Sequence, residues 1–121
     1  MINYLKKRYY IRYCENVIKE NSFTFYKAFS KIDDKTKREA VYVVYAFCRY
    51  ADDLIDEHQD ENGLIQLQSD LTYFISGKKP KHPIFKALTY IKDLYPKGYD
   101  FKPYFDMIQG QFMDLKKNRY K

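Results

Sequence analysis

Long apolar runs and frequent cysteines are both missing from this 121-residue sequence. No stretch approaches the roughly 18 consecutive apolar residues of a membrane-spanning helix. The charged residues near the start follow a very short apolar segment, which is the reverse of a signal peptide. Only two cysteines are present, Cys14 and Cys48, and they show no metal-binding spacing. A cytoplasmic, reduced setting with structural roles for both thiols is therefore expected.

Strand-like alternation, internal repeats and low-complexity linkers are absent as well, so the sequence favours an all-α protein. Residues 1–121 are expected to form a single helical domain. Apolar residues at helical spacing, together with the Gly and Pro positions, predict six helices. Four of them are expected over about residues 4–20, 23–30, 34–57 and 83–94. Another carries the apolar residues from Leu64 to Ile75 and is stopped by Gly77, and the last opens at Pro103.

A net charge of +6 raises the question of nucleic acid as a partner. The basic residues are dispersed, and no helix-turn-helix, RNA-binding or zinc signature accompanies them. We therefore expect no nucleic-acid partner. A basic surface also suits an anionic substrate, or peripheral association with the inner face of an anionic membrane.

Three carboxylates stand out in the third predicted helix, at Asp52, Asp53 and Asp56. Residues four apart lie one above the other on a helix, so Asp52 and Asp56 project side by side. Like charges at this spacing destabilise a helix, and Arg49 can answer only part of them. The remaining negative charge suits a hard divalent cation such as Mg2+.

The rest of this helix is apolar on two sides. One predicted stripe is made by Val41, Val44, Cys48, Ala51 and Ile55, and the other by Val43, Phe47, Tyr50 and Leu54. At about 100° per residue, Tyr45 and Arg49 share the narrow polar strip of the aspartates. A helix packed on both sides would turn that strip towards a cavity rather than open water.

Three segments together resemble the squalene/phytoene synthase family, which joins two prenyl diphosphates head to head. The first is the Arg49–Asp56 run preceded by Tyr45, which resembles the family's first aspartate-rich motif. The second covers residues 21–25, where Asn21 replaces the family's histidine. The third covers residues 105–120. The sequence looks most similar to the bacterial dehydrosqualene synthases.

The resemblance implies the N-terminal helices of an isoprenoid-synthase bundle and a Mg2+-dependent prenyltransferase acting on a prenyl diphosphate such as farnesyl diphosphate. The product class would be squalene, dehydrosqualene or phytoene, in terpenoid or carotenoid biosynthesis. The implied catalytic residues are Asp52, Asp56 and Arg49, and the implied metal ligands are Asp52, Asp53 and Asp56. The implied substrate-binding residues are Ser22, Thr24, Phe25, Tyr45 and Arg49.

Some of these residues also have simpler interpretations. Arg49 can simply be the intrahelical partner of Asp53, with no role in binding. Ser22 can be a helix N-cap, and Phe25 can be a core residue.

The family's second aspartate-rich motif has no counterpart in residues 1–121. We therefore expect a partial form of such an enzyme, with an exposed half-core that favours self-association. The alternative is a non-catalytic helical interaction module derived from such an enzyme.

Overall fold

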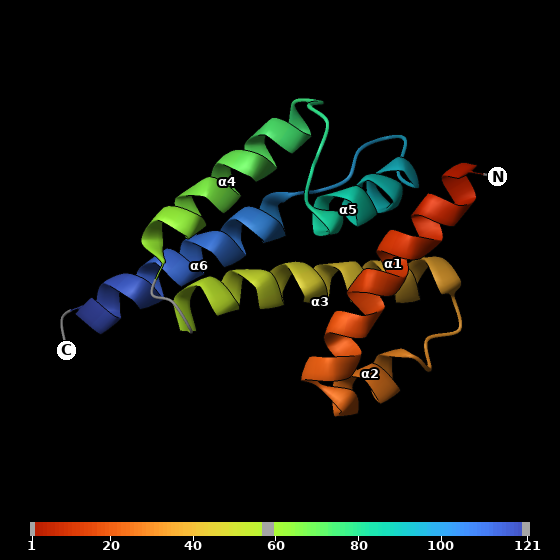
Figure 1. The fold of residues 1–121 in the computed structure, drawn as a ribbon, viewed down its shortest axis with the longest axis horizontal. Coiled ribbons are helices and arrows are strands. Elements are labelled where there is room, and N and C mark those ends of the chain that lie inside the picture. The colour runs from red at the N-terminus through yellow and green to blue at the C-terminus, as the bar shows by residue number, and fades with distance from the viewer. Residues whose placement is uncertain (1, 57–59, 120–121) are drawn as a thin grey trace. The chain divides into compact units, whose positions relative to one another are not determined.

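The structure is a computed structural model that describes residues 2–56 and 60–119, and the side chains of residues 5–55 and 60–117. The described residues form six α-helices and no β-strand, so the all-α prediction is confirmed (Figure 1). The helices are α1 (Ile2–Asn21), α2 (Phe23–Phe29), α3 (Lys35–Asp56), α4 (Glu61–Ile75), α5 (Pro83–Asp93) and α6 (Lys102–Arg119). Within this part of the chain, none of the helices combines the length and hydrophobicity that crossing a bilayer requires.

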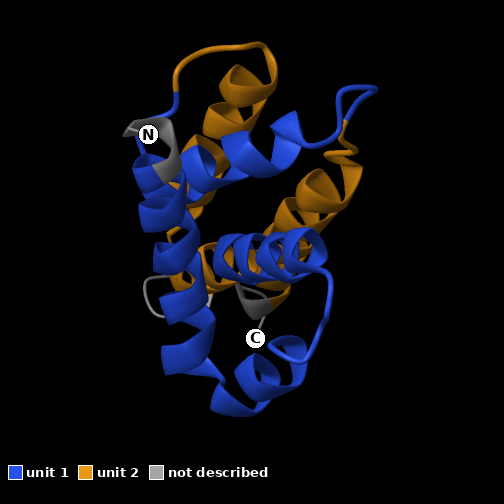
Figure 2. Cartoon of the chain, turned by 90° about the vertical axis from the view of Figure 1, so that its right-hand side faces the viewer, with its two compact units in different colours: residues 1–47, 80–98 blue, residues 48–79, 99–121 orange. Residues whose placement is uncertain are grey.

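The chain divides into two compact units (Figure 2). Unit 1 consists of residues 1–47 and 80–98, and unit 2 of residues 48–79 and 99–121. Helix α3 runs through both, giving its N-terminal part to unit 1 and its C-terminal part to unit 2. The expectation of a single domain stays a prediction.

Unit 1 is built on the packing of α1 against α5 and α2. In its core, the Phe47 and Phe85 rings meet edge to face, with centroids 5.9 Å apart and an interplanar angle of 84°. The remaining buried residues come from α1, α3 and α5: Ile11, Cys14, Ile18, Tyr42, Val43, Ala46, Ile84, Ala87, Leu88 and Ile91. The complete burial of Cys14 confirms its predicted structural role.

Helix α2 has no buried residue and is connected to its neighbours through polar side chains. The Tyr26 hydroxyl donates to Glu15 of α1 at 2.8 Å, and this hydrogen bond is the main reason that the pKa of Tyr26 is raised. Ser30, directly after α2, shares a 2.7 Å hydrogen bond with the hydroxyl of Tyr42 on α3. These hydrogen bonds supplement the contact between the Tyr26 and Tyr42 rings, whose centroids lie 6.0 Å apart.

Unit 2 is built on the packing of α4 against α6. Its buried residues are Ala51 and Ile55 of α3, Leu64, Leu67, Leu71 and Phe74 of α4, and Tyr104, Ile108 and Leu115 of α6. An aromatic cluster of Phe74, Tyr99, Phe101 and Tyr104 joins the end of α4 to the beginning of α6. The Tyr99 and Tyr104 hydroxyls share a hydrogen bond at 2.7 Å, which gives each polar group a partner inside the cluster.

The two predicted stripes of α3 are only partly correct. Val43, Phe47, Ala51 and Ile55 are buried as expected. Val44 was assigned to a packed face but is 39% exposed, whereas Tyr42 and Ala46 are buried. The buried residues lie on different sides of α3 in its N-terminal and C-terminal parts, because a different set of helices packs against α3 in each unit.

Side-chain caps explain several helix boundaries. Asp34 accepts hydrogen bonds from the backbone of Thr36 at 2.9 Å and Lys37 at 3.2 Å, so the predicted cap is confirmed. His82, which we expected to be a surface residue, accepts a hydrogen bond at Nδ1 from the backbone of Ile84 at 3.1 Å and thereby caps α5.

The polar segment 60–63 follows the end of α3 as expected, and it also forms the beginning of α4, which we had expected to start later. Asp60 is the N-cap and accepts a 2.8 Å hydrogen bond from the backbone of Gly63. A Cβ at position 63 would contact the Asp60 carboxylate and lie 3.0 Å from Leu54 Cδ2. Glycine is required here for space, because α3 and the Asp60 cap approach too closely for a side chain.

We predict that Gly63→Ala lowers the free energy of unfolding by about 1–3 kcal/mol, because Leu54 and the Asp60 cap must shift. Gly110→Ala is the control, since a Cβ at position 110 meets no atom within 4 Å. Gly110 lies inside α6, so its replacement should stabilise by roughly 0.5–1 kcal/mol. Urea unfolding measures both values, and equal effects of the two substitutions would contradict the crowding at Gly63.

Cys14 should make stability depend on pH in the alkaline range. Burial raises its pKa from 9.0 to about 12. Below pH 9.0 the thiol is protonated in both states, so its full contribution to stability is present. Between pH 9.0 and about 12, only the unfolded thiol ionises, and stability falls by about 1.4 kcal/mol per pH unit.

Tyrosines titrate in the same range, so Cys14→Ala serves as the reference. Urea unfolding across this range should show the stability difference, parent minus variant, shrinking as pH rises. A difference that stays constant with pH would disprove the assignment to Cys14.

Candidate functional site

The C-terminal part of α3 carries an accessible acidic strip in unit 2. Asp52 and Asp53 are both half-buried, with Asp53 38% exposed at its side chain. Asp52 and Asp53 lie on the accessible strip because Ala51 and Ile55, which flank them in sequence, are buried in the core. Asp56 is the last residue of α3, and its side chain lies outside the described residues.

Gln111 of α6 contacts the strip directly. Its side-chain amide donates a hydrogen bond to Oδ1 of Asp52. We did not assign Gln111 to the site from the sequence, although it lies in the third segment of the family resemblance. The signal that could have identified it is its position in α6, one turn after the buried Ile108 and one turn before the buried Leu115.

Arg49 forms an ion pair with Asp53, one helical turn further along α3. Arg49 Nε lies 3.0 Å from Asp53 Oδ1. Both atoms are shielded from solvent, and among the described residues neither has a partner with hydrogen-bond geometry. The contact is therefore electrostatic, and the pairing of Arg49 with Asp53 that we considered from the sequence is present. The guanidinium has five N–H donors, so this ion pair engages only part of it.

Asp52 also affects a neighbouring thiol. The pKa of Cys48 is raised, first by burial and second by the negative charge of Asp52. The thiol therefore stays protonated at neutral pH, and a neutral thiol is a poor nucleophile and metal ligand. Cys48 is half-buried beside the strip.

The chemistry of the donors suits a hard cation, because carboxylate oxygens are the ligands that Mg2+ prefers. In the part of the chain that the structure describes, no three acidic, histidine or cysteine side chains converge on one point. Mg2+ commonly uses one or two carboxylates and completes its coordination with water and phosphate oxygens. Asp52 and Asp53 could supply the carboxylates of such a site.

The N-terminal substrate element belongs to unit 1. Ser22 caps α2, where its hydroxyl accepts a 3.4 Å hydrogen bond from the backbone of Phe25, so the capping contact that we considered is present. Thr24 is exposed, and Phe25 is 54% exposed, so the interpretation of Phe25 as a core residue is wrong. Tyr45, on α3, is half-buried. The substrate-binding roles of these residues stay predictions.

Comparison with known proteins identifies the family. A family model described as squalene/phytoene synthase matches residues 18–121. The chloroplastic phytoene synthase of Narcissus pseudonarcissus is 33% identical over 122 aligned positions, which cover 98% of this chain and 28% of that protein. The phytoene synthase of Arthrospira platensis is 30% identical over 111 positions, covering 88% of this chain and 35% of that protein. The chain belongs to the squalene/phytoene synthase family.

A solved structure agrees with this membership. The crystal structure of a dehydrosqualene synthase in complex with ligand matches 94% of this chain with a TM-score of 0.85 and 43% sequence identity. The match covers 39% of that protein's chain. The chain thus spans well under half the length of these relatives.

We predict a measurable coupling between Asp52 and Gln111. A double-mutant cycle with Asp52→Ala and Gln111→Ala should give about 1 kcal/mol, because the hydrogen bond joins a carboxylate to an amide across two helices. The matched cycle with Arg49→Ala and Asp53→Ala should give less, about 0.3–0.5 kcal/mol, since that pair is partly exposed and intrahelical. Urea unfolding of each set provides the values, and zero coupling for the first pair would refute the contact.

Proposed function

We propose that this chain contributes the first aspartate-rich wall of a Mg2+-dependent enzyme that joins two prenyl diphosphates head to head. The observation that supports it is the accessible strip on α3, where Asp52 and Asp53 lie beside Arg49 and Gln111. Family membership supplies the reaction class. Electrostatics and positioning are what such a reaction demands of its protein, because charge develops on the departing diphosphate.

Each residue of the strip has a separate task in this proposal. Asp52 and Asp53 hold the cation with Asp56, whose side chain lies outside the described residues. Gln111 orients the Asp52 carboxylate through its amide. Arg49 presents the rest of its guanidinium to phosphate oxygens while Asp53 holds one edge of it. The bound cation would neutralise the charge of the departing diphosphate.

The N-terminal element would meet the substrate by another kind of contact. Phe25 is largely exposed, and its ring centroid lies 5.9 Å from that of Phe29, so the two rings form an accessible aromatic surface. We assign to that surface, with Ser22, Thr24 and Tyr45, the binding of the prenyl diphosphate. An apolar lining would also exclude water from a reactive carbocation.

A second candidate function is a non-catalytic helical interaction module. It is favoured by the large exposed side chains Phe23 and Phe25 on α2 and Met113 on α6, which are 57%, 54% and 65% exposed. Such a module needs apolar surface and no metal. The two candidates therefore differ in their response to Mg2+ and diphosphate together.

Thermal unfolding of this chain with Mg2+, with inorganic pyrophosphate and with both provides the test. If the strip holds a cation that in turn binds diphosphate, the shift in Tm with both should exceed the sum of the separate shifts. Replacing Asp52 and Asp56 by Asn should abolish this excess and leave the helix content, measured by circular dichroism, unchanged.

The control variant is Glu20→Gln with Asp33→Asn, which removes the same charge from exposed positions outside the strip. It should retain the excess shift. If the double aspartate variant still responds like the parent, or if the parent shows no excess, the interaction module becomes the better description.

A further inference from the structure

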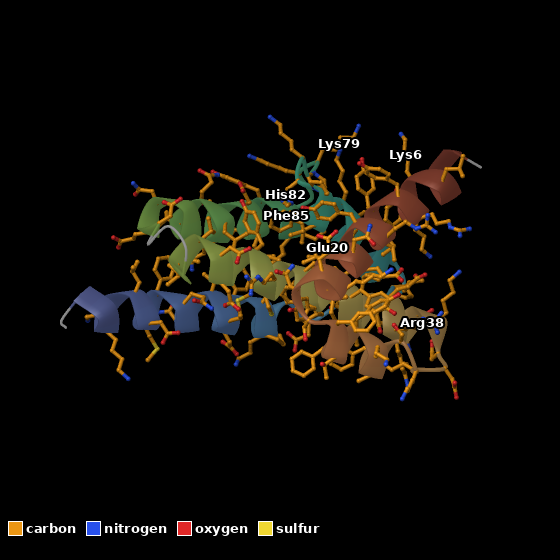
Figure 3. All side chains as sticks on the ribbon, turned by 60° about the horizontal axis from the view of Figure 1, so that its bottom comes forward. Lys6, Glu20, Arg38, Lys79, His82 and Phe85 are labelled. Atoms are coloured by element: carbon orange, nitrogen blue, oxygen red, sulfur yellow. The ribbon has the colours of Figure 1, made fainter. Side chains whose placement is uncertain are left out.

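A second charged feature lies in unit 1 and takes no part in the proposed prenyl transfer. A cleft of about 280 Å³ lies between α1 and the N-terminal part of α3. Its floor includes the buried Ile11 and Tyr42, and its walls are polar. Figure 3 labels Arg38, one of its lining residues, near the beginning of α3.

The cleft gathers cations from two helices. Lys7, Arg8 and Arg12 come from α1, and Lys35 and Arg38 come from α3. Arg8 and Arg12 are four residues apart on one helix, a spacing at which like charges destabilise. The fold thus brings five positive charges around one hollow, although repulsion opposes this arrangement.

Two carboxylates in the cleft offset only part of this positive charge, and both already contact other side chains. Glu15 accepts the hydrogen bond from the Tyr26 hydroxyl at 2.8 Å. Glu39 lies 4.0 Å from Lys35 in a long intrahelical ion pair. With five cations and two carboxylates, the lining keeps a formal excess of three positive charges.

One of the cations is held in a defined position. Arg38 is half-buried, and its Nη1 donates a 2.8 Å hydrogen bond to the backbone carbonyl of Ile32. The hydroxyl of Tyr42 on the floor is similarly fixed by its hydrogen bond to Ser30. A guanidinium that is already held in place reduces the ordering cost of binding, which distinguishes this cleft from a patch of mobile surface lysines.

We propose that this cleft binds a phosphate group, at a site separate from the acidic strip. Guanidinium groups match phosphate oxygens in geometry, and ammonium groups add charge. A phosphate carrying about two negative charges would offset most of the excess. Either a free phosphate compound or the headgroup of an anionic lipid provides this chemistry.

The test for the free compound is a phosphorus NMR titration of inorganic phosphate into this chain in a metal chelator. The chelator removes the divalent cation that the proposed prenyl-transfer site needs, so failure of one proposal leaves the other intact. Saturable binding to the parent protein is expected, weakening as ionic strength rises. The cleft variant is Lys7→Gln with Arg12→Gln, which should bind roughly tenfold more weakly.

The control variant is Lys116→Gln with Lys117→Gln, which removes the same charge from exposed positions on α6. It should bind phosphate within about twofold of the parent. Circular dichroism confirms that both variants keep their helices. Equal losses of phosphate affinity in the two variants would show a general charge effect and would contradict binding in the cleft.

The lipid arm uses cosedimentation with vesicles of phosphatidylcholine, with and without phosphatidylglycerol. A lipid headgroup is the ligand if the phosphatidylglycerol-dependent binding is lost in the cleft variant and kept in the control. A free phosphate compound is the ligand if only the NMR titration depends on the cleft. If neither measurement responds to the cleft variant, the proposal is wrong.

Discussion

Helix α3 carries its charges against its own dipole, and this constraint governs the arrangement around it. A helix favours acidic residues in its first turn and basic residues in its last. Among the residues of α3, Lys35, Lys37 and Arg38 stand near the beginning, while Asp52, Asp53 and Asp56 stand at the end. Each such charge costs up to about 1 kcal/mol unless another group answers it.

Different groups in the two units offset this unfavourable interaction with the helix dipole. In unit 1, Asp34 caps the beginning of α3 with its carboxylate, and Glu39 lies within reach of Lys35. In unit 2, Arg49 and Gln111 approach the carboxylates at the other end. These groups compensate only part of the charge, which leaves positive charge at the beginning of α3 and negative charge at its end.

Sequence reasoning reached the architecture because helix periodicity, caps and breakers are local signals. The six helices begin and end close to the expected positions, and the Asp34 cap was identified correctly. The beginning of α4 at Glu61 was missed although Asp60 is a local N-cap signal, whereas the crowding at Gly63 arises from Leu54 of another helix and cannot be read from local signals. The exposure of Val44 was missed for a similar reason, since burial depends on which helices pack against α3.

The residues of the candidate site fall into the same two groups, those that local signals predict and those that depend on packing between helices. The aspartates and Arg49 lie within one helix, so spacing alone predicted that Arg49 can pair with Asp53. Gln111 reaches Asp52 from 59 residues further along the chain, and periodicity cannot reveal such a contact. The mistaken assignment of Phe25 to the core came from judging an aromatic residue by type, when α2 buries no residue at all.

The polar attachment of α2 has a consequence for the dynamics of this chain. Because α2 has no fully buried side chain, its opening should need less free energy than global unfolding, although it would break the ring contact between Tyr26 and Tyr42. The hydrogen bonds to Glu15 and Tyr42 then hold this segment in place, but the core does not depend on them. The segment that carries Ser22, Thr24 and Phe25 can therefore open while the rest of unit 1 stays folded.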